Sequence, residues 1–480
     1  MSSLPVYQLL KTASEQWPNE PAVYDEYGTL TFKELFEETE ELKINLLKLG
    51  ITSGMGVGVM ARNGRNFITG IFAVIGCGAC VMPLSHQLKS AELDDVLNEA
   101  QLYAILDDLN GVTPTATKSS LIKLKIDSFR FSTTNISQSH IFAAHVFQPA
   151  FIRFTSGTTG KSKGVVVSHC SVEERITAAN KALNLSVGDT VVWVLPMAYH
   201  FVVSIVLYVK YGAAIAIAKD FLAKNIIEIT NQHKGTLLYA SPMQIRLLAN
   251  DTSETMLPSL KKVISTSAAI SADVCNAFKK RFGINVSQAY GIIEIGLPII
   301  NTIKSEEQPD AVGYALPDYQ VEILDDNHNL LPIGSVGHLA IKGPGMFDAY
   351  LTPPMLREQV LKNGYFLTAD YASKSIDGLV KVEGREKSMI NVSGNKVFPE
   401  EVEAVLENLP EIKLARISGT PHPLMGQIVQ AEIVLAEGAS IDVEEVLTYC
   451  RKKLSTYKIP QRVKIVDSLP MTGSGKIQRY

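Results

Sequence analysis

One segment in the first half of the chain restricts the fold more than any other. Residues 151–169 read FIRFTSGTTGKSKGVVVSH, so a β-rich run enters a loop of glycines, hydroxyls and lysines and a second β-rich run leaves it. Glycines allow backbone N–H groups to turn inward on an anion, and hydroxyl and ammonium groups add further donors. The segment therefore predicts a phosphate-binding loop between two β-strands.

Two other interpretations account for less of this segment. A Walker A loop ends as Gly160-Lys161-Ser162 does, but it requires glycine at position 155, which is Thr155, and a helix after the loop. A plain surface loop rich in serine, threonine and glycine is the second alternative, and the density of donors disfavours it. We therefore favour a phosphate loop of a kind other than Walker A.

Composition excludes several classes of protein. The 480 residues carry a net charge of −4, which leaves no basic footprint for nucleic acid. Five scattered cysteines are typical of reduced thiols in a cytosol, and Cys77 and Cys80, a C-x-x-C without a second pair, are expected to be buried and inert. Neither a basic-then-apolar start nor an apolar run of 18 residues occurs, so we expect a cytoplasmic protein without a stable membrane span.

Hydrophobic patterns predict an α/β architecture for most of the chain. Helix-like and strand-like segments alternate over residues 1–150 and 191–282, which indicates sheets with helices on their faces. The segment that begins at Thr31 is expected to form a helix with one apolar face, made by Leu35, Leu42, Leu46 and Leu47.

A compact module follows a boundary near residues 385–390. Pro399 is expected to start a helix there, because proline suits the first helical position and the acids that follow suit the positive end of the helix dipole. We predict a large α/β domain of stacked sheets at 1–387, which binds ATP and the acyl group. A small, mobile α+β domain is predicted at 388–480.

The phosphate loop and six further motifs resemble, in order, those of the acyl-adenylate-forming superfamily. This superfamily includes acyl- and aryl-CoA ligases, adenylation domains of peptide synthetases, and luciferases. Each motif alone is weak, but their order and spacing match the family over nearly the whole chain. Besides the loop TSGTTG–KG at 155–164, they are TFKEL at 31–35, LPMAYH at 195–200, QAYGIIE at 288–294, GYFLTAD at 364–370, GREKSMINVSGNKVFPEEVE at 384–403 and LPMTGSGKIQR at 469–479.

The resemblance implies a role for each motif in two half-reactions: a carboxylate attacks the α-phosphate of ATP, and a thiol then takes the acyl group from the adenylate. Tyr290 would stack on adenine, Asp370 would accept both ribose hydroxyls, and Arg385 would reach ribose or phosphate. Nucleotide contacts are also implied for Thr155, Ser156, Gly157, Thr158, Thr159, Gly160, Lys163, Ala268, Gly291 and, along the thiol's path, Gly394.

The reacting groups need positive charge, because two anions must meet. By resemblance, Lys476 would bridge the substrate carboxylate and the α-phosphate, and Glu294 would hold Mg²⁺ with Thr155 as a helper. His200 would border the acyl pocket. Its spacing from Pro196 is one residue longer than the family's, so Tyr199 is an alternative for that role and a core histidine is another.

The chain departs from the family pattern at several neutral positions, while the ionic groups are kept. Ile293 stands where the family has threonine or serine, and Ala369 stands where it has glycine. The other departures are Ser162 in place of proline, Ser388 in place of the hinge aspartate, and STSAAI at 265–270 in the adenine loop. The resemblance therefore predicts an active AMP-forming acid–thiol ligase.

The acid and its acceptor are narrowed by what surrounds the motifs. Amino-acid-activating members hold the substrate ammonium with an aspartate, and no acidic residue occurs between Val191 and Lys219. Apolar neighbours of the motifs favour a fatty or aromatic acid. The acceptor is coenzyme A or the phosphopantetheine arm of an acyl carrier protein, and a non-catalytic adenylate binder is the alternative from another class.

Overall fold

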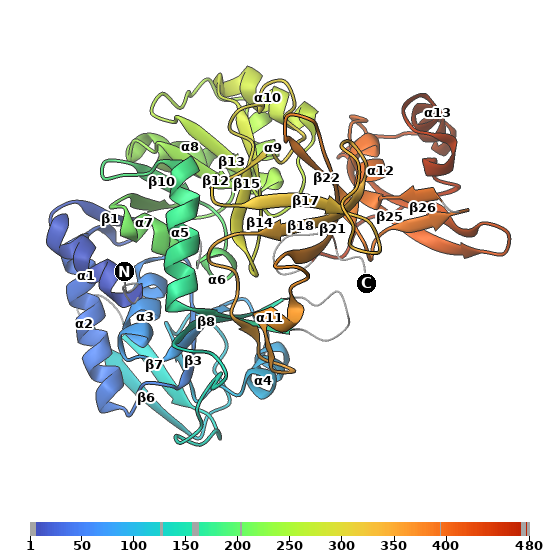
Figure 1. The fold of residues 1–480 in the computed structure, drawn as a ribbon. Helices are drawn as coiled ribbons and strands as arrows, with labels where there is room; N and C mark the ends of the chain where they lie inside the picture. The colour runs from blue at the N-terminus through green and yellow to red at the C-terminus, as the bar shows by residue number, and fades with distance from the viewer. Residues whose placement is uncertain are drawn as a thin grey trace.

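The computed structural model describes residues 6–124, 128–155, 163–201, 204–393, 395–471 and 477. Its body contains two nine-stranded sheets with helices packed against them, and the C-terminal part, orange to red in Figure 1, projects from one side of the body. The predicted α/β class, with a large N-terminal part and a smaller α+β C-terminal part, is confirmed.

The first large sheet carries the strands on both sides of the predicted phosphate loop. Its inner strands β3, β4, β5 and β8 are parallel, and β9 returns antiparallel to β8. In spatial order the strands are β20 (Met355–Leu356), β19 (Ala349–Tyr350), β9 (Lys163–Ser168), β8 (Pro149–Thr155), β4 (Cys80–Ser85), β3 (Gly56–Ala61), β5 (Ala104–Asp107), β7 (Ser128–Thr133) and β6 (Lys118–Lys123).

The second large sheet has six consecutive parallel strands flanked by antiparallel edges. The carboxyl ends of parallel strands meet at one edge of a sheet, which is where α/β folds bind ligands. In spatial order the strands are β16 (Tyr314–Ala315), β15 (Gly296–Ile300), β14 (Val286–Ile292), β13 (Lys262–Ser265), β12 (Leu237–Ala240), β10 (Thr190–Trp193), β11 (Ala214–Ile217), β1 (Pro21–Asp25) and β2 (Gly28–Thr31).

Two smaller sheets, one antiparallel and one mixed, complete the strand architecture of the described residues. The four-stranded sheet has the order β17 (Gln320–Leu324), β18 (Gly337–Lys342), β21 (Phe366–Lys374) and β22 (Val380–Arg385). The C-terminal sheet has the order β24 (Asn395–Val397), β23 (Ile390–Val392), β26 (Gly426–Leu435) and β25 (Ile412–His422), with β27 (Arg462–Ile465) parallel to β26.

Helices cover the sheets and link them. Helix α5 contacts β15 of one large sheet and β8 and β9 of the other, so it joins the two. The helices are α1 (Val6–Gln16), α2 (Phe32–Lys48), α3 (Arg65–Gly76), α4 (Ser90–Ala100), α5 (His169–Leu183), α6 (Met197–His200), α7 (Ile205–Lys210), α8 (Ala223–Gln232), α9 (Pro242–Ala249), α10 (Ala272–Phe282), α11 (Arg357–Val360), α12 (Pro399–Leu406), α13 (Val443–Lys453) and the 3₁₀ turn η1 (Thr456–Lys458). Among the described residues, no helix combines the length and the apolar character needed to span a bilayer.

Helix α2 shows how local sequence sets an element boundary. The Thr31 hydroxyl accepts a hydrogen bond from the Glu34 N–H at 3.2 Å, and the Glu34 carboxylate accepts one from the Thr31 N–H at 2.9 Å. This capping box satisfies two donors at the start of the helix. The predicted apolar face is correct for three of its leucines, but the prediction for Leu47 is wrong. Leu47 is 47% exposed, because the 100° turn per residue places it beside the buried Leu46.

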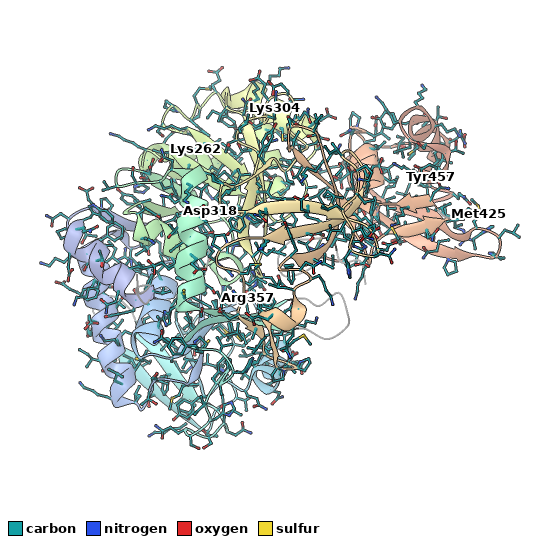
Figure 2. The ribbon with its side chains drawn as sticks, viewed as in Figure 1. Lys262, Lys304, Asp318, Arg357, Met425 and Tyr457 are labelled. Carbon is teal, nitrogen blue, oxygen red and sulfur yellow. The ribbon has the colours of Figure 1, made fainter. Side chains whose placement is uncertain are left out.

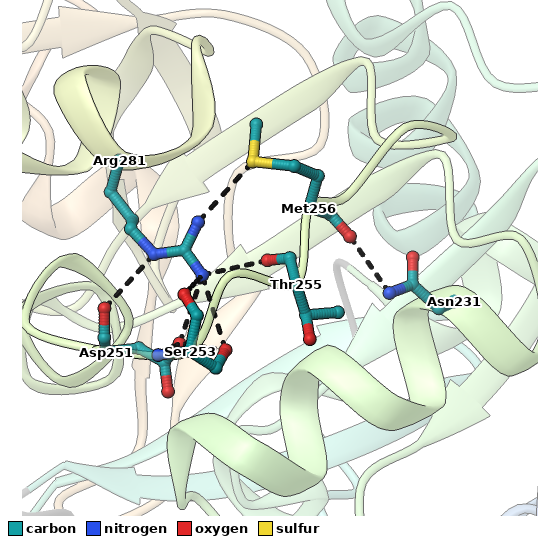
Figure 3. A network of polar contacts seen from close by, with 6 residues as sticks. All are labelled: Asn231, Asp251, Ser253, Thr255, Met256 and Arg281. Carbon is teal, nitrogen blue, oxygen red and sulfur yellow. Dashed lines mark hydrogen bonds and ion pairs between the residues drawn. The ribbon is translucent and has the colours of Figure 1, made fainter.

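Arg281 fixes the loop between α9 and α10 (Figure 3). Its guanidinium donates to the Asp251 backbone carbonyl at 3.1 Å and to the Thr255 carbonyl at 2.8 Å, and it forms an ion pair of 3.1 Å with the Asp251 carboxylate. Asn231 adds a bond to the Met256 carbonyl from α8. These contacts hold the loop against α10 and α8.

The C-terminal part has an apolar core that belongs to it alone. The residues of that core run from Ile390 to Cys450, and they come from β23–β26, α12 and α13. Figure 2 places Met425 and Tyr457 on this projecting part, while Asp318, which pairs with Lys181 at 2.6 Å, lies on the body. The exact boundary at 387/388 stays a prediction.

Candidate active site

Strands β8 and β9 pair as a hairpin, and the predicted phosphate loop is the segment that connects them. Thr155, the last residue of β8, pairs with Lys163, the first residue of β9. The predicted contacts from Ser156, Gly157, Thr158, Thr159 and Gly160 fall outside the described residues, as does the side chain of Thr155. A strand rather than a helix leaves the loop, as predicted, because the residues 164–168 are rich in β-branched valine.

Lys163 and Glu294 both contact Tyr350. The Lys163 ammonium is 4.7 Å from the centre of the Tyr350 ring, and the Tyr350 hydroxyl donates to Glu294 Oε1 at 3.4 Å. Strand β19 pairs with β9, so Tyr350 is opposite Val165 and is fixed to the strand that leaves the loop. We call Lys163, Tyr350 and Glu294 the Glu294 cluster. Sequence reasoning missed Tyr350, whose position depends on a strand pairing across almost 200 residues.

Glu294 sits in the turn between β14 and β15. Its carbonyl accepts a hydrogen bond from the Phe347 N–H at 2.6 Å. Burial raises the pKa of Glu294, and the Tyr350 hydroxyl together with Arg153 and Arg175 lowers it in part. Among the described residues, no lysine or arginine nitrogen lies within 4 Å of its carboxylate oxygens, so the carboxylate has no counter-ion at that distance.

Arg175, on α5, holds the turn that carries Glu294. It is fully buried and donates to the Ile293 carbonyl at 2.9 Å and to the Gly345 carbonyl at 2.8 Å. Burial lowers the pKa of Arg175 to about 10, which leaves it charged at neutral pH. A Cβ on Gly345, whose φ is +64°, would lie 2.5 Å from the Arg175 backbone nitrogen, so glycine is required there. Ile293 thus contributes its carbonyl, and sequence reasoning missed Arg175.

Asp370, Arg385 and Tyr290 form a second group, which we call the Asp370 cluster. Arg385 on β22 is directly opposite Asp370 on β21, and its Nε lies 3.1 Å from Asp370 Oδ1. The Tyr290 hydroxyl donates to Asp370 Oδ2 at 2.5 Å. Asp370 is 3% exposed, so its charge is held by these two partners inside the protein. The structure therefore brings together three residues that the sequence separates by 95 positions.

The protonation of this cluster follows from its geometry. Burial, and then the neighbouring Asp370 carboxylate, raise the pKa of Tyr290, so its hydroxyl stays a donor. Burial alone would lower the pKa of Arg385, but the charge of Asp370 opposes it and the pKa is raised overall. The cluster is thus a carboxylate stabilised by one cation and one hydroxyl.

Two small residues shape the same strands. Ala369 has a φ of +59°, a left-handed conformation that glycine adopts at lower cost, so the departure from glycine at this position introduces local strain of about 1 kcal/mol. Gly291 is required by close approach, because a Cβ there would lie 2.6 Å from the Gly296 carbonyl oxygen. Both residues flank the Asp370 cluster.

His200 lies at the end of α6 and faces the loop that follows β13. Its Nε2 is 3.5 Å from the Ser267 hydroxyl, and its ring meets Trp193 edge-on at 6.2 Å. Ala268, the next residue in that loop, is exposed. Tyr199, which precedes His200 on α6, packs its ring against the Arg153 guanidinium. Which of His200 and Tyr199 borders the acyl pocket therefore stays a prediction.

The remaining predicted residues are accounted for as follows. Lys476 and Gly394 fall outside the described residues. Cys77 and Cys80 are buried, as predicted, and burial raises the pKa of the Cys77 thiol to about 12, which keeps it protonated. Within the described residues, no group of three or more His, Cys, Asp and Glu side chains is arranged to hold a metal ion. A single carboxylate such as Glu294 suits Mg²⁺, which binds proteins through one or two carboxylates and takes its other ligands from phosphates and water.

The site therefore contains the carboxylates of Asp370 and Glu294, together with Lys163 at the end of the glycine-rich loop. A family model described as AMP-binding enzyme matches residues 10–351, and one described as AMP-binding enzyme C-terminal domain matches residues 401–476. The chain belongs to the AMP-binding enzyme family. The family predicted from the sequence motifs is therefore confirmed.

Curated relatives in this family are named as CoA ligases. A putative acyl–CoA ligase of Bacillus subtilis (strain 168) is 26% identical, with 94% of this chain and 93% of that protein covered. A 2-succinylbenzoate–CoA ligase of Geobacillus sp. (strain WCH70) is 28% identical, with 96% of this chain and 94% of that protein covered. The predicted enzyme class, an AMP-forming acid–thiol ligase, agrees with these names and with the family.

The fold also agrees with solved structures. ATP-bound MatB from Rhodopseudomonas palustris superposes with a TM-score of 0.84 at 22% identity, with 99% of this chain and 97% of that chain covered. At this identity the likeness shows the fold alone, and it supports the architecture of a large domain with a smaller C-terminal one.

Proposed function

We propose that this enzyme uses ATP to convert a carboxylic acid to an acyl-adenylate and then transfers the acyl group to the thiol of coenzyme A. The observation that carries the proposal is the β14–β15 hairpin. This hairpin places Tyr290 four residues from Glu294. Tyr290 donates a hydrogen bond to Asp370, and Glu294 accepts one from Tyr350, whose ring also contacts Lys163. One hairpin thereby joins a group suited to ribose with a group suited to phosphates and a cation.

Each charged group has a role in the first half-reaction. Asp370 accepts the ribose hydroxyls while Arg385 and Tyr290 keep it ionised and oriented, since charged acceptors make the stronger hydrogen bonds. Lys163 and the glycine-rich loop bind the phosphates. Glu294 is the group that would hold Mg²⁺, and the ion would supply charge neutralisation at the phosphates. Lys476 is proposed to offset the charge where the carboxylate meets the α-phosphate.

The second half-reaction requires the small domain to move. We place the hinge near Ser388, whose hydroxyl donates to the Arg385 carbonyl at 3.1 Å and to Glu400 at 3.3 Å. Contacts between the two parts include the Arg246–Glu407 ion pair of 2.9 Å and the bond of 3.1 Å from Lys396 to the Tyr371 hydroxyl. Rotation would break these polar contacts and would bring Gly394 toward the path of the thiol.

The acid is proposed to have an apolar body, either fatty or aromatic. Ile292 and Ile293 are only partly buried beside Glu294, and the Trp193–Tyr239 pair, stacked at 5.8 Å, lies next to His200. A 2-succinylbenzoate–CoA ligase among the relatives acts by its name on an aromatic acid. An amino-acid substrate is disfavoured, because its ammonium would enter this region without a carboxylate partner.

The proposal is tested by pyrophosphate exchange across a panel of fatty and aromatic acids. Acids that support exchange are then offered coenzyme A or a phosphopantetheinylated acyl carrier protein, and thioester formation is measured. We expect exchange that depends on the acid and on Mg²⁺, followed by transfer to coenzyme A. Transfer to the carrier protein alone would replace the acceptor, and adenylate binding without exchange for any acid would refute the enzyme activity.

A further inference from the structure

Arg153 is a partly buried arginine whose charge the described residues satisfy only in part. It is the residue two positions before Thr155 on β8. One of its terminal nitrogens donates to the Tyr199 carbonyl, and its guanidinium carbon lies 5.0 Å from the centre of the Tyr199 ring. Its Nε is inaccessible to water and has no hydrogen-bond partner among the described residues. Within them, no carboxylate oxygen lies within 4 Å of the guanidinium.

The same fold treats another buried arginine differently. Arg65 is 2% exposed, and its guanidinium forms three contacts of 2.6–3.1 Å with the Asp25 carboxylate and one of 3.0 Å with the Gly28 carbonyl. Arg65 thus has a counter-ion at hydrogen-bond distance. Arg175, which is also fully buried, instead donates to two backbone carbonyls, and one of its terminal nitrogens has no partner among the described residues. Arg153 has one carbonyl and one aromatic face, although guanidinium carries five donors and its burial without an anion is costly.

The surroundings of Arg153 place it in the candidate site. Alternation along β8 puts its side chain on the face of Phe151, which packs against Phe201 just after α6. Burial lowers the pKa of Arg153 to about 10, and the charge of Glu294 works in the opposite direction, so Arg153 is within the field of the Glu294 cluster. The residue is still charged at neutral pH.

Its direct contacts point toward the acyl side rather than the phosphates. Among the described residues, the guanidinium contacts the carbonyl and the ring of Tyr199 on α6, the helix that also carries His200 toward Ser267. Lys163, by contrast, contacts Tyr350 in the Glu294 cluster. A cation on an apolar floor next to the proposed acyl pocket suits an anion on the acyl group.

We propose that Arg153 binds a second acid group on the substrate, so that the preferred acid carries an oxyanion, a carboxylate or a sulfonate, in addition to the carboxylate that is activated. The inference rests on the proposed function, and it narrows the substrate class from a fatty or aromatic acid to one with an acidic substituent. A planar guanidinium fits such a group, because two parallel N–H donors can meet its two oxygens.

The test compares matched acids that differ only in this substituent. Pyrophosphate exchange is measured for adipate against hexanoate and for terephthalate against 4-methylbenzoate, and for longer members of each series, with wild type, Arg153→Met and Arg153→Lys. We expect wild type to have the higher kcat/KM for the diacid of at least one pair. In Arg153→Met that value falls by about 10–100-fold, as expected for a charge-assisted hydrogen bond, while the monoacid changes less than threefold.

Three further outcomes decide between the alternatives. Thermal unfolding of Arg153→Met is expected at or above the wild-type temperature, because removing a poorly paired buried charge is neutral or stabilising, and Arg153→Lys should retain part of the preference for diacids. An equal loss for every acid would assign Arg153 to the reacting groups common to all substrates and would overturn the inference. Exchange with monoacids only would also overturn it and leave the proposed function intact, whereas no exchange with any acid would refute the function itself.

Discussion

The Asp370 cluster and the Glu294 cluster handle buried charge in opposite ways. Asp370 is enclosed, and its two oxygens already have Arg385 at 3.1 Å and the Tyr290 hydroxyl at 2.5 Å. The Glu294 carboxylate has, within the part of the chain that the structure describes, one long hydrogen bond of 3.4 Å, from Tyr350. The first carboxylate is oriented by two protein partners, whereas the second has no lysine or arginine nitrogen within 4 Å among the described residues and is proposed to bind a cation.

This difference suggests a division of labour. A preorganised carboxylate costs nothing to arrange when ribose arrives, which favours binding. The Glu294 cluster would gain its ionic partners only when the phosphates and the cation are bound. It would then act where charge develops during the reaction, which is where electrostatic stabilisation accelerates chemistry. We therefore expect changes at the Glu294 cluster to lower the rate, and changes at the Asp370 cluster to weaken nucleotide binding.

The largest effect is expected for Lys476→Ala. The proposed role of Lys476 is confined to the reacting anions, so adenylation should fall by about 10²–10³-fold while ATP binding and thioester formation from supplied adenylate stay near wild type. The two half-reactions are measured separately, by pyrophosphate exchange and by transfer from preformed adenylate. Lys464→Ala, an exposed lysine on β27 of the same domain, is the matched control. Equal losses in both half-reactions would remove the distinction.

Glu294→Gln should follow, with adenylation lowered by about 100-fold. The substitution preserves size but removes the charge proposed to hold Mg²⁺, so the Mg²⁺ concentration for half-maximal exchange should rise and binding of AMP should not change. Glu173→Gln, which alters a carboxylate on α5 paired with Lys210 at 3.5 Å, serves as the control. An unaltered Mg²⁺ dependence would place the metal elsewhere.

Asp370→Ala should raise the KM for ATP by about 10–100-fold, because the ribose hydroxyls lose a charged acceptor worth about 1.5–3 kcal/mol. The KM for the acid should stay within a few-fold of wild type, which separates a binding defect from general damage. Asp377→Ala removes a carboxylate that accepts from the Tyr314 hydroxyl at 2.8 Å on an exposed turn, and it should leave both values unchanged. If ATP dependence is unaffected in Asp370→Ala, the nucleoside is bound by other residues.

Tyr350→Phe is expected to have the smallest effect, a loss of about 3–10-fold in adenylation. The ring that faces Lys163 is kept and only the long hydrogen bond to Glu294 is removed, which is worth about 0.5–1.5 kcal/mol. The Mg²⁺ requirement should rise slightly, as a weaker form of the Glu294→Gln effect. Tyr314→Phe loses the corresponding bond to Asp377 and should behave like wild type. A larger effect than that of Glu294→Gln would mean that Tyr350 contacts the reactants directly.

The local patterns of the chain predict the phosphate loop, the strands beside it, the capped helix after Thr31 and the class of the fold. Those features depend on residues close in sequence: glycine and hydroxyl spacing, β-branched runs and caps act over a few positions. The charged residues at 163, 294, 370 and 385 could be selected for the same reason, since each lies in a short motif of a known family.

What surrounds those charged residues was decided by strand pairing over long distances. Tyr350 reaches Glu294 because β19 pairs with β9, and Arg385 reaches Asp370 because β22 pairs with β21. Arg175 supports the Glu294 turn from a helix more than 100 positions away. Among the described residues, Arg153 has no counter-ion within 4 Å, and the sequence could not show this. An arginine in a β-rich run gives no information about its partners until the neighbouring elements have packed. Burial and pairing, which set the charge of every group in the site, are properties of the folded chain as a whole.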